Sequence, residues 1–152
     1  MNTKILCLIV LFVSLTKADE DEEPNLKMDD MVEALETFTS SCEPKPKKEH
    51  IKEMLQMKKN PQRETKCLRY CLMKQFDMMN ESETEIVIDK AVELMNMGIQ
   101  NKLGEKELKE SAGTCAVKAK KITDKCELGY VFSMCVVEEL EKRGFKMPEI
   151  KE

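Results

Sequence analysis

Histidine and tryptophan are nearly absent from this sequence, which has one histidine, His50, and no tryptophan. Catalytic triads and most catalytic zinc sites use histidine as a base or a ligand. His50 stands in a charged run, residues 47–50. That setting is typical of a solvated surface histidine, and we prefer it to a pH-sensing role. We therefore expect no catalytic residues, no cofactor and no metal site.

A hydrophobic run long enough to span a membrane, about 20 residues, is also lacking. The clearest apolar run, residues 5–13, follows Lys4 and precedes the small residue Ala18. A basic start, a short apolar centre and a small residue at the end are typical of a secretory signal peptide. We predict a signal over residues 1–18 and a secreted, extracellular protein with a single domain over residues 19–152. No stable membrane insertion is expected.

Lysine and arginine residues do not outnumber aspartate and glutamate residues. The formal net charge is −4, and loss of Lys4 and Lys17 with the signal would make it −6. Proteins that bind nucleic acid need a basic face, so nucleic acid is excluded as a partner. The acidic balance favours solubility.

Strand patterns are lacking too, whereas helical periodicity recurs along the chain. It predicts an all-α fold of six helices without internal repeats. Apolar residues of the first helix recur at steps of three, four and seven, from Met28 to Cys42. The second helix is expected over residues 47–58, the third through residue 76, the fourth up to Gly98, and the sixth from Asp124 to Lys142. The fifth helix carries an apolar stripe with small residues, which allow close packing or leave space: Leu108, Ala112, Cys115, Ala119 and Ile122.

Capping residues mark several helix boundaries. Asn60 and Pro61 fit an N-cap and a first-turn proline for the third helix. Ser82 and Glu85 fit a capping box for the fourth. Asp124 fits an N-cap for the sixth. Two glycines fit helix ends: Gly98 and Gly144.

Six cysteines remain after the signal is removed, an even number that predicts three disulfides in a small secreted chain. Two of them, Cys67 and Cys71, lie four residues apart in a helical stretch, so both thiols share one helix face. They are poorly placed to bond each other and are expected to reach separate elements. Fifteen pairings of six cysteines are possible, and the residues alone leave the partners open.

The cysteine spacing, C-x24-C-x3-C-x43-C-x10-C-x8-C, resembles that of the six-cysteine insect odorant-binding proteins. The x3 and x8 steps are its most specific parts, while the x24 and x43 gaps lie at the ends of the usual range. The resemblance implies a compact six-helix bundle around an internal apolar cavity, with interlocked bridges. It also implies the pairing: Cys42–Cys71, Cys67–Cys126 and Cys115–Cys135.

Methionine is abundant, with 12 in the chain. Its flexible, polarisable side chain adapts to ligands of varied shape, although it also fills gaps in ordinary cores. Together with the resemblance, the methionines favour an internal pocket for one small hydrophobic ligand. The residues expected to line it are Met31, Leu35, Phe38, Leu55, Met73, Phe76, Ile88, Val92, Met95, Ala119, Phe132 and Val136.

Two further features leave alternatives open. The tail, residues 145–152, fits either a lid over the pocket or a frayed terminus. Asn80-Glu81-Ser82 is an N-glycosylation sequon. Because Ser82 is also the expected cap, we do not expect the sequon to be occupied.

The resemblance implies a carrier that binds odorants or pheromones reversibly and transports them through aqueous lymph towards membrane receptors. An olfactory receptor would then be a partner, and the carrier would be a monomer or a weak homodimer. The alternative is a secreted interaction or defence protein of saliva or haemolymph with the same fold. Expression in antenna favours the first reading, and expression in salivary gland or fat body favours the second.

Overall fold

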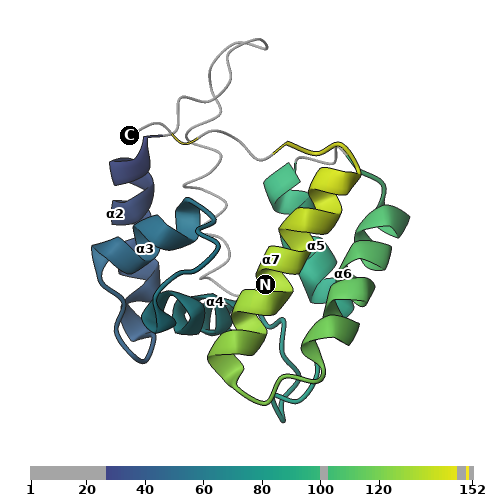
Figure 1. Ribbon diagram of the computed structural model, residues 1–152, viewed down its shortest axis with the longest axis horizontal. Helices are drawn as coiled ribbons and strands as arrows, with labels where there is room; N and C mark the ends of the chain where they lie inside the picture. The colour runs from purple at the N-terminus through teal and green to yellow at the C-terminus, as the bar shows by residue number, and fades with distance from the viewer. Residues whose placement is uncertain (1–26, 100–102, 147–149, 151–152) are drawn as a thin grey trace.

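The computed structural model describes residues 27–99, 103–146 and 150, and the predicted signal peptide, residues 1–18, lies outside them. Six α-helices follow one another in the described residues, with one short 3-10 helix between the first two (Figure 1). The predicted all-α fold is confirmed. The elements are α2 (Met28–Phe38), η1 (Thr39–Ser41), α3 (Lys48–Leu55), α4 (Arg63–Gln75), α5 (Ile88–Ile99), α6 (Glu105–Ala119) and α7 (Lys125–Lys142).

Two apolar clusters form the core. The α2–α3 cluster consists of Met28, Val32, Cys42, Ile51, Met54 and Leu68. The α5–α7 cluster includes Leu108, Ala112, Leu128, Phe132 and Leu140, together with Tyr70 and Met73 of α4. Because α4 contributes side chains to both clusters, it links the two halves of the molecule. Figure 1 shows α2 and α3 on one side, α5, α6 and α7 on the other, and α4 joining them below.

Helix α4 approaches α7 unusually closely at Gly129. A Cβ atom built at Gly129 would lie 2.5 Å from the backbone nitrogen of Tyr70, so only glycine fits there. One turn earlier on both helices, Cys67 and Cys126 form a disulfide with their Cα atoms 4.1 Å apart. The close contact between α4 and α7 therefore depends on two neighbouring features, the absence of a side chain at Gly129 and the Cys67–Cys126 disulfide.

Two other disulfides are present, Cys42–Cys71 and Cys115–Cys135. The first ties the segment after η1 to α4, and the second ties α6 to α7. Cys67 and Cys71 do leave α4 for separate elements, and the three bonds have the pairing that the resemblance implied. Each bridge closes a loop of tens of residues, which by chain entropy stabilises the fold by about 3–4 kcal/mol.

Both ends of α7 have the predicted capping residues. The Asp124 carboxylate accepts a hydrogen bond from the Glu127 N–H at 2.9 Å. At the other end, Gly144 adopts a φ of 87°, a left-handed conformation that glycine takes without strain. The N–H groups of Gly144 and Phe145 donate to the carbonyls of Glu141 and Leu140, which is the Schellman pattern.

Helix α4 begins later than predicted, at Arg63, so the assignment of Asn60 and Pro61 to its start is wrong. The reason is a tertiary contact from α3. The carboxylate of Glu53 accepts hydrogen bonds from the Gln62 N–H at 2.9 Å and from the Thr65 hydroxyl at 2.7 Å. This buried carboxylate provides the cap that a local side chain was expected to supply.

His50 is buried, with 3% of its surface exposed, so the prediction of a solvated surface histidine is wrong. It lies one turn before Met54 on the inner face of α3, and this i, i+4 relation outweighs its charged neighbours in sequence. Its Nδ1 accepts a hydrogen bond from the Lys47 N–H at 3.2 Å, which satisfies one free donor at the start of α3.

Substitution of Gly129 by alanine tests the helix contact. The added methyl group would overlap the Tyr70 backbone, and overpacking of this kind costs about 1–3 kcal/mol. Gly113→Ala on α6 is the matched control, because no atom beyond its own helix backbone and chain neighbours lies within 4 Å of its Cβ position. The control is expected to gain about 0.5–1 kcal/mol. Urea unfolding with the disulfides intact measures both, and equal stability of the two variants would contradict the packing.

The Glu53 cap predicts a dependence of stability on pH. Burial alone would raise the pKa of Glu53, but hydrogen bonds from Lys58, Thr65 and Gln62 outweigh it and lower the pKa from 4.5 to about 2. The folded pKa lies below the unfolded one, so this stabilisation is present above pH 4.5 and is lost as the pH falls towards 2.

Glu53→Gln should therefore lower the free energy of unfolding at pH 7 by about 1–3 kcal/mol. The difference from the parent protein should shrink on acidification to pH 2. The control is Glu33→Gln, which changes an exposed carboxylate on α2. A pH-independent loss in Glu53→Gln would show that the carboxylate charge does not contribute.

Candidate functional site

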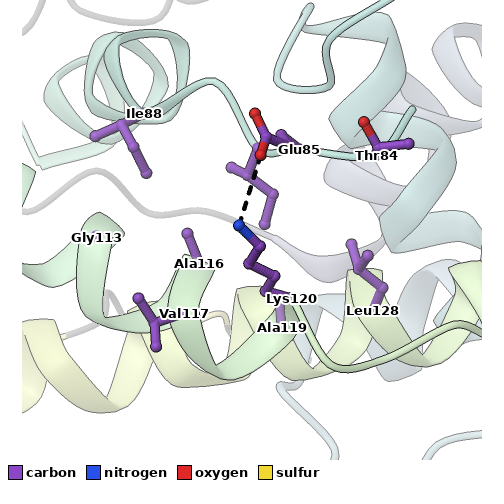
Figure 2. Close-up of a pocket in the computed structure, with 10 residues that line it drawn as sticks. Thr84, Glu85, Ile88, Gly113, Ala116, Val117, Ala119, Lys120 and Leu128 are labelled. Carbon is purple, nitrogen blue, oxygen red and sulfur yellow. Dashed lines mark ion pairs between the residues drawn. The ribbon is translucent and has the colours of Figure 1, made fainter. Parts of the chain in front are cut away.

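An apolar groove with a volume of about 280 Å³ lies between the loop before α5 and the C-terminal half of α6. Figure 2 shows its two walls, with Ile88 and Glu85 on one side and Ala116, Val117 and Lys120 on the other. Leu128 of α7 closes one end. Its apolar lining consists of Ile86, Ile88, Gly113, Ala116, Val117, Ala119 and Leu128. Its polar lining consists of Thr84, Glu85 and Lys120.

Small residues on α6 create the hollow. Gly113 and Ala116 lie one turn apart on the side that faces the loop, and a Cβ atom at Gly113 would meet no atom within 4 Å beyond its own helix backbone and chain neighbours. Val117 beside them is 70% exposed and adds apolar surface to the groove lining. The groove therefore offers apolar surface that the protein itself leaves uncovered.

The loop wall is held by one asparagine rather than by a helix cap. The Asn80 Oδ1 accepts hydrogen bonds from the N–H groups of Thr84, at 2.8 Å, and Glu85, at 3.1 Å. Its Nδ2 donates to the Thr84 hydroxyl at 3.1 Å. The predicted capping box of Ser82 and Glu85 is therefore wrong, and α5 begins at Ile88. An isolated antiparallel β-bridge between Met79 and Ile86 closes the same loop.

Glu83 anchors this loop to the two helices that meet at Gly129. It adopts a φ of 55°, a conformation that is strained for a residue with a side chain. Its carboxylate accepts a hydrogen bond from the Tyr70 hydroxyl at 3.0 Å and pairs with Lys125 and Lys74. Hydrogen bonds from Lys125, Lys74 and Tyr70 lower the pKa of Glu83 to about 2, so the anchor is ionised at any physiological pH.

The pKa of Tyr70 shifts in the opposite direction to that of Glu83. Burial of its ring, and then its hydrogen bond to the Glu83 carboxylate, raise the pKa of Tyr70 to about 12. The hydroxyl therefore remains a donor near neutral pH. Together with Lys125 of α7, it fixes the position of the groove wall relative to α4 and α7.

An ion pair spans the rim of the groove, as the dashed line in Figure 2 shows. The Lys120 Nζ lies 3.6 Å from the Glu85 Oε1, and both side chains are largely exposed. Lys120 is the C-cap of α6, and its N–H donates to the Ala116 carbonyl at 2.9 Å. A lysine at this end of a helix is favoured by the helix dipole. The groove thus combines an apolar floor with one positive and one negative group at its edge.

The predicted pocket residues do not come together at this groove. Ile88 and Ala119 line it. Six others belong to or pack against the α5–α7 cluster: Met73, Phe76, Val92, Met95, Phe132 and Val136. Leu35 and Leu55 pack against the α2–α3 cluster. Met31 is half-buried on α2. Their role as ligand contacts stays a prediction.

Phe38 and Phe76 form the aromatic contact between the two halves. Their ring centroids lie 5.4 Å apart, and they join the end of α2 to the end of α4. Aromatic pairs at this distance attract each other beyond their buried area. These two predicted pocket residues therefore serve as a packing contact between the halves.

Several lining residues were not anticipated from the sequence. They are Thr84, Glu85, Ile86, Gly113, Ala116, Val117, Lys120 and Leu128. The small-residue stripe of α6 was the available signal, and it did suggest space beside that helix. The loop residues had no signal, because the sequence pattern placed them in the first turn of a helix.

The predicted lid lies partly outside the described residues, which include 145, 146 and 150 of the tail. Phe145 packs against the α5–α7 cluster, and Ile150 packs against the α2–α3 cluster. A lid function of this tail stays a prediction, as does the state of the sequon at Asn80.

Other kinds of site were sought in the described ranges. Within them, no group of three or more histidine, cysteine, aspartate or glutamate side chains is placed to hold a metal ion. Over the same part of the chain, each helix is too short or too polar to cross a bilayer.

Comparison with known proteins adds two similarities. The model of the PBP/GOBP family matches residues 25–139. Among solved structures, the chain is similar to an odorant-binding protein from Drosophila melanogaster, with 19% identity and a TM-score of 0.51. That similarity covers 78% of this chain and 93% of the other, and at this identity it concerns the fold alone. No curated protein sequence matches the chain.

Removal of the Asn80 side chain tests the loop anchor. In Asn80→Ala, the N–H groups of Thr84 and Glu85 lose their acceptor, so their hydrogen exchange should speed up about tenfold. Asn80→Asp is the control, because it keeps an acceptor oxygen in the same place while it removes the sequon. Exchange that is equally fast in the parent protein and both variants would contradict the anchoring role.

Proposed function

The chain belongs to the PBP/GOBP family, and on that premise we propose that it is a secreted, non-enzymatic carrier of small hydrophobic molecules. The observation that supports a carrier in this chain is the groove beside α6, whose apolar floor is left uncovered. Ligand sites in proteins are concave and lined mostly by apolar side chains with a few polar groups, as this groove is. A small apolar ligand in the groove would remove that surface from water.

The size of the groove limits the ligand. At about 30 Å³ per water-sized atom in a liquid, 280 Å³ encloses about nine non-hydrogen atoms, so a larger ligand such as a three-ring fluorophore would extend out of the open side of the groove. Burial of the apolar surface of such a compound contributes about 25 cal/mol per Å². A micromolar dissociation constant, about −8 kcal/mol, stays below the ceiling for ligands of this size.

The cycle needs no chemical step. The ligand enters from water, is held by apolar contact and leaves when the concentration falls or a receptor competes for it. The disulfides support this role, because cross-links keep the helices in place beside a groove that stays open. Transport of odorants or pheromones through aqueous lymph to an olfactory receptor is the proposed context.

A fluorescence titration tests the proposal. The oxidised, delipidated chain is expected to bind the apolar fluorophore 1-aminoanthracene saturably, with one site per chain. Gly113→Leu should weaken this binding about tenfold or more, since the new side chain would occupy part of the groove. Thr114→Leu is the matched control, because Thr114 is exposed on the same helix and does not line the groove.

Two results would contradict the proposal. Unchanged affinity in Gly113→Leu would place the bound probe away from the groove. The absence of saturable binding, in protein shown to hold all three disulfides, would remove the carrier function. A secreted interaction or defence protein with the same fold would then be the better explanation.

A further inference from the structure

The polar residues at the rim of the groove indicate which polar group a ligand should have, whereas the apolar floor does not. Only three polar residues are among those that line it, and two of them, Glu85 and Lys120, bear opposite charges. Lys120 reaches from α6 across the groove, and Glu85 meets it from the loop (Figure 2). Any ligand that lies along the floor with its polar end outward meets this pair.

We propose that the Glu85–Lys120 pair selects ligands with a neutral hydroxyl group, so that the preferred occupant is a small aliphatic alcohol. This inference rests on the proposed carrier function and specifies the ligand class of the same groove. It follows from the distance between the two charged groups, from their exposure and from their fixed backbones.

The distance suits an inserted hydroxyl. The Lys120 Nζ and the Glu85 Oε1 are 3.6 Å apart, which exceeds a normal hydrogen bond of about 2.9 Å and is less than twice its length. One oxygen atom can therefore lie within hydrogen-bond distance of both. A hydroxyl accepts a hydrogen bond from the ammonium and donates one to the carboxylate, so that both charged groups are hydrogen-bonded at once.

Ligands with other polar groups interact favourably with only one of the two side chains, Glu85 or Lys120. A ketone accepts from Lys120 but has no proton for Glu85. A carboxylate pairs with Lys120 and is repelled by Glu85, while an ammonium is attracted to Glu85 and repelled by Lys120. Because the two protein charges cancel, a charged ligand gains little net attraction and loses part of its hydration.

Insertion of the hydroxyl disturbs little else. Both side chains are largely exposed, so their direct attraction is weak and water competes with it already. Their backbones are fixed: the Glu85 N–H donates to Asn80, and Lys120 ends α6 with its own N–H bonded to Ala116. The two charges can therefore move apart slightly without any change in the groove walls.

Displacement of 1-aminoanthracene by four compounds of equal chain length tests this selectivity: 1-octanol, 2-octanone, octanoate and octylamine. At pH 7, 1-octanol is expected to displace the probe at the lowest concentration. Lys120→Met should weaken 1-octanol about 3- to 10-fold and strengthen octylamine, because Glu85 is then unopposed. Glu85→Gln should weaken 1-octanol similarly and strengthen octanoate.

The control is Lys121→Met, which makes the same change in net charge at the next residue, exposed and outside the groove lining. It should leave the order of the four compounds unchanged. Equal displacement by all four, or one order shared by the parent protein and all variants, would overturn the selectivity while the carrier function stands. Failure of the probe to bind at all would overturn both.

Discussion

The contact between α4 and α7 is the constraint on which the rest of the structure depends. The missing side chain at Gly129 lets the two helices approach, and the Cys67–Cys126 disulfide keeps them together. This contact brings Tyr70 of α4 beside Lys125 of α7, and both bind the Glu83 carboxylate. Glu83 in turn fixes the loop that supplies one wall of the groove. The site is therefore positioned through tertiary contacts from helices that line little of it.

Much of the fold could be predicted from the sequence, because helical periodicity reports directly on which face of each helix is buried. The stripe of α6 is an example: Leu108, Ala112, Cys115 and Ala119 are all fully buried. One error arose where a distant group replaced a local one, because Glu53 of α3 caps α4 in place of Asn60. No pattern of neighbouring residues contains that information. Another error arose from competition between local side chains, because Asn80 rather than Ser82 accepts hydrogen bonds from the N–H groups of this segment.

Few of the residues that line the groove could be predicted from the sequence, for a physical reason. Periodicity identifies inward-facing residues but does not say which of two cores they join. Leu35 and Phe132 both face inward, yet they belong to different clusters. The methionines were also expected to line the pocket. Met54, Met73 and Met78 are buried as core residues, and the described lining of the groove contains no methionine. In the structure these flexible side chains pack between helices, and their role as ligand contacts stays a prediction.

The separation of the two clusters has a consequence for how this sequence can vary. In the described part of the chain, no Cα atom of α2 or α3 lies within 8 Å of a Cα atom of α5, α6 or α7, and α4 lies between them. Effects of substitutions at distant sites without shared partners usually add. Changes around Ile88 and Ala116 can therefore accumulate without compensating changes around Ile51. Selection can thus reshape the proposed binding groove while the disulfide frame and the α2–α3 half of the molecule keep their own constraints.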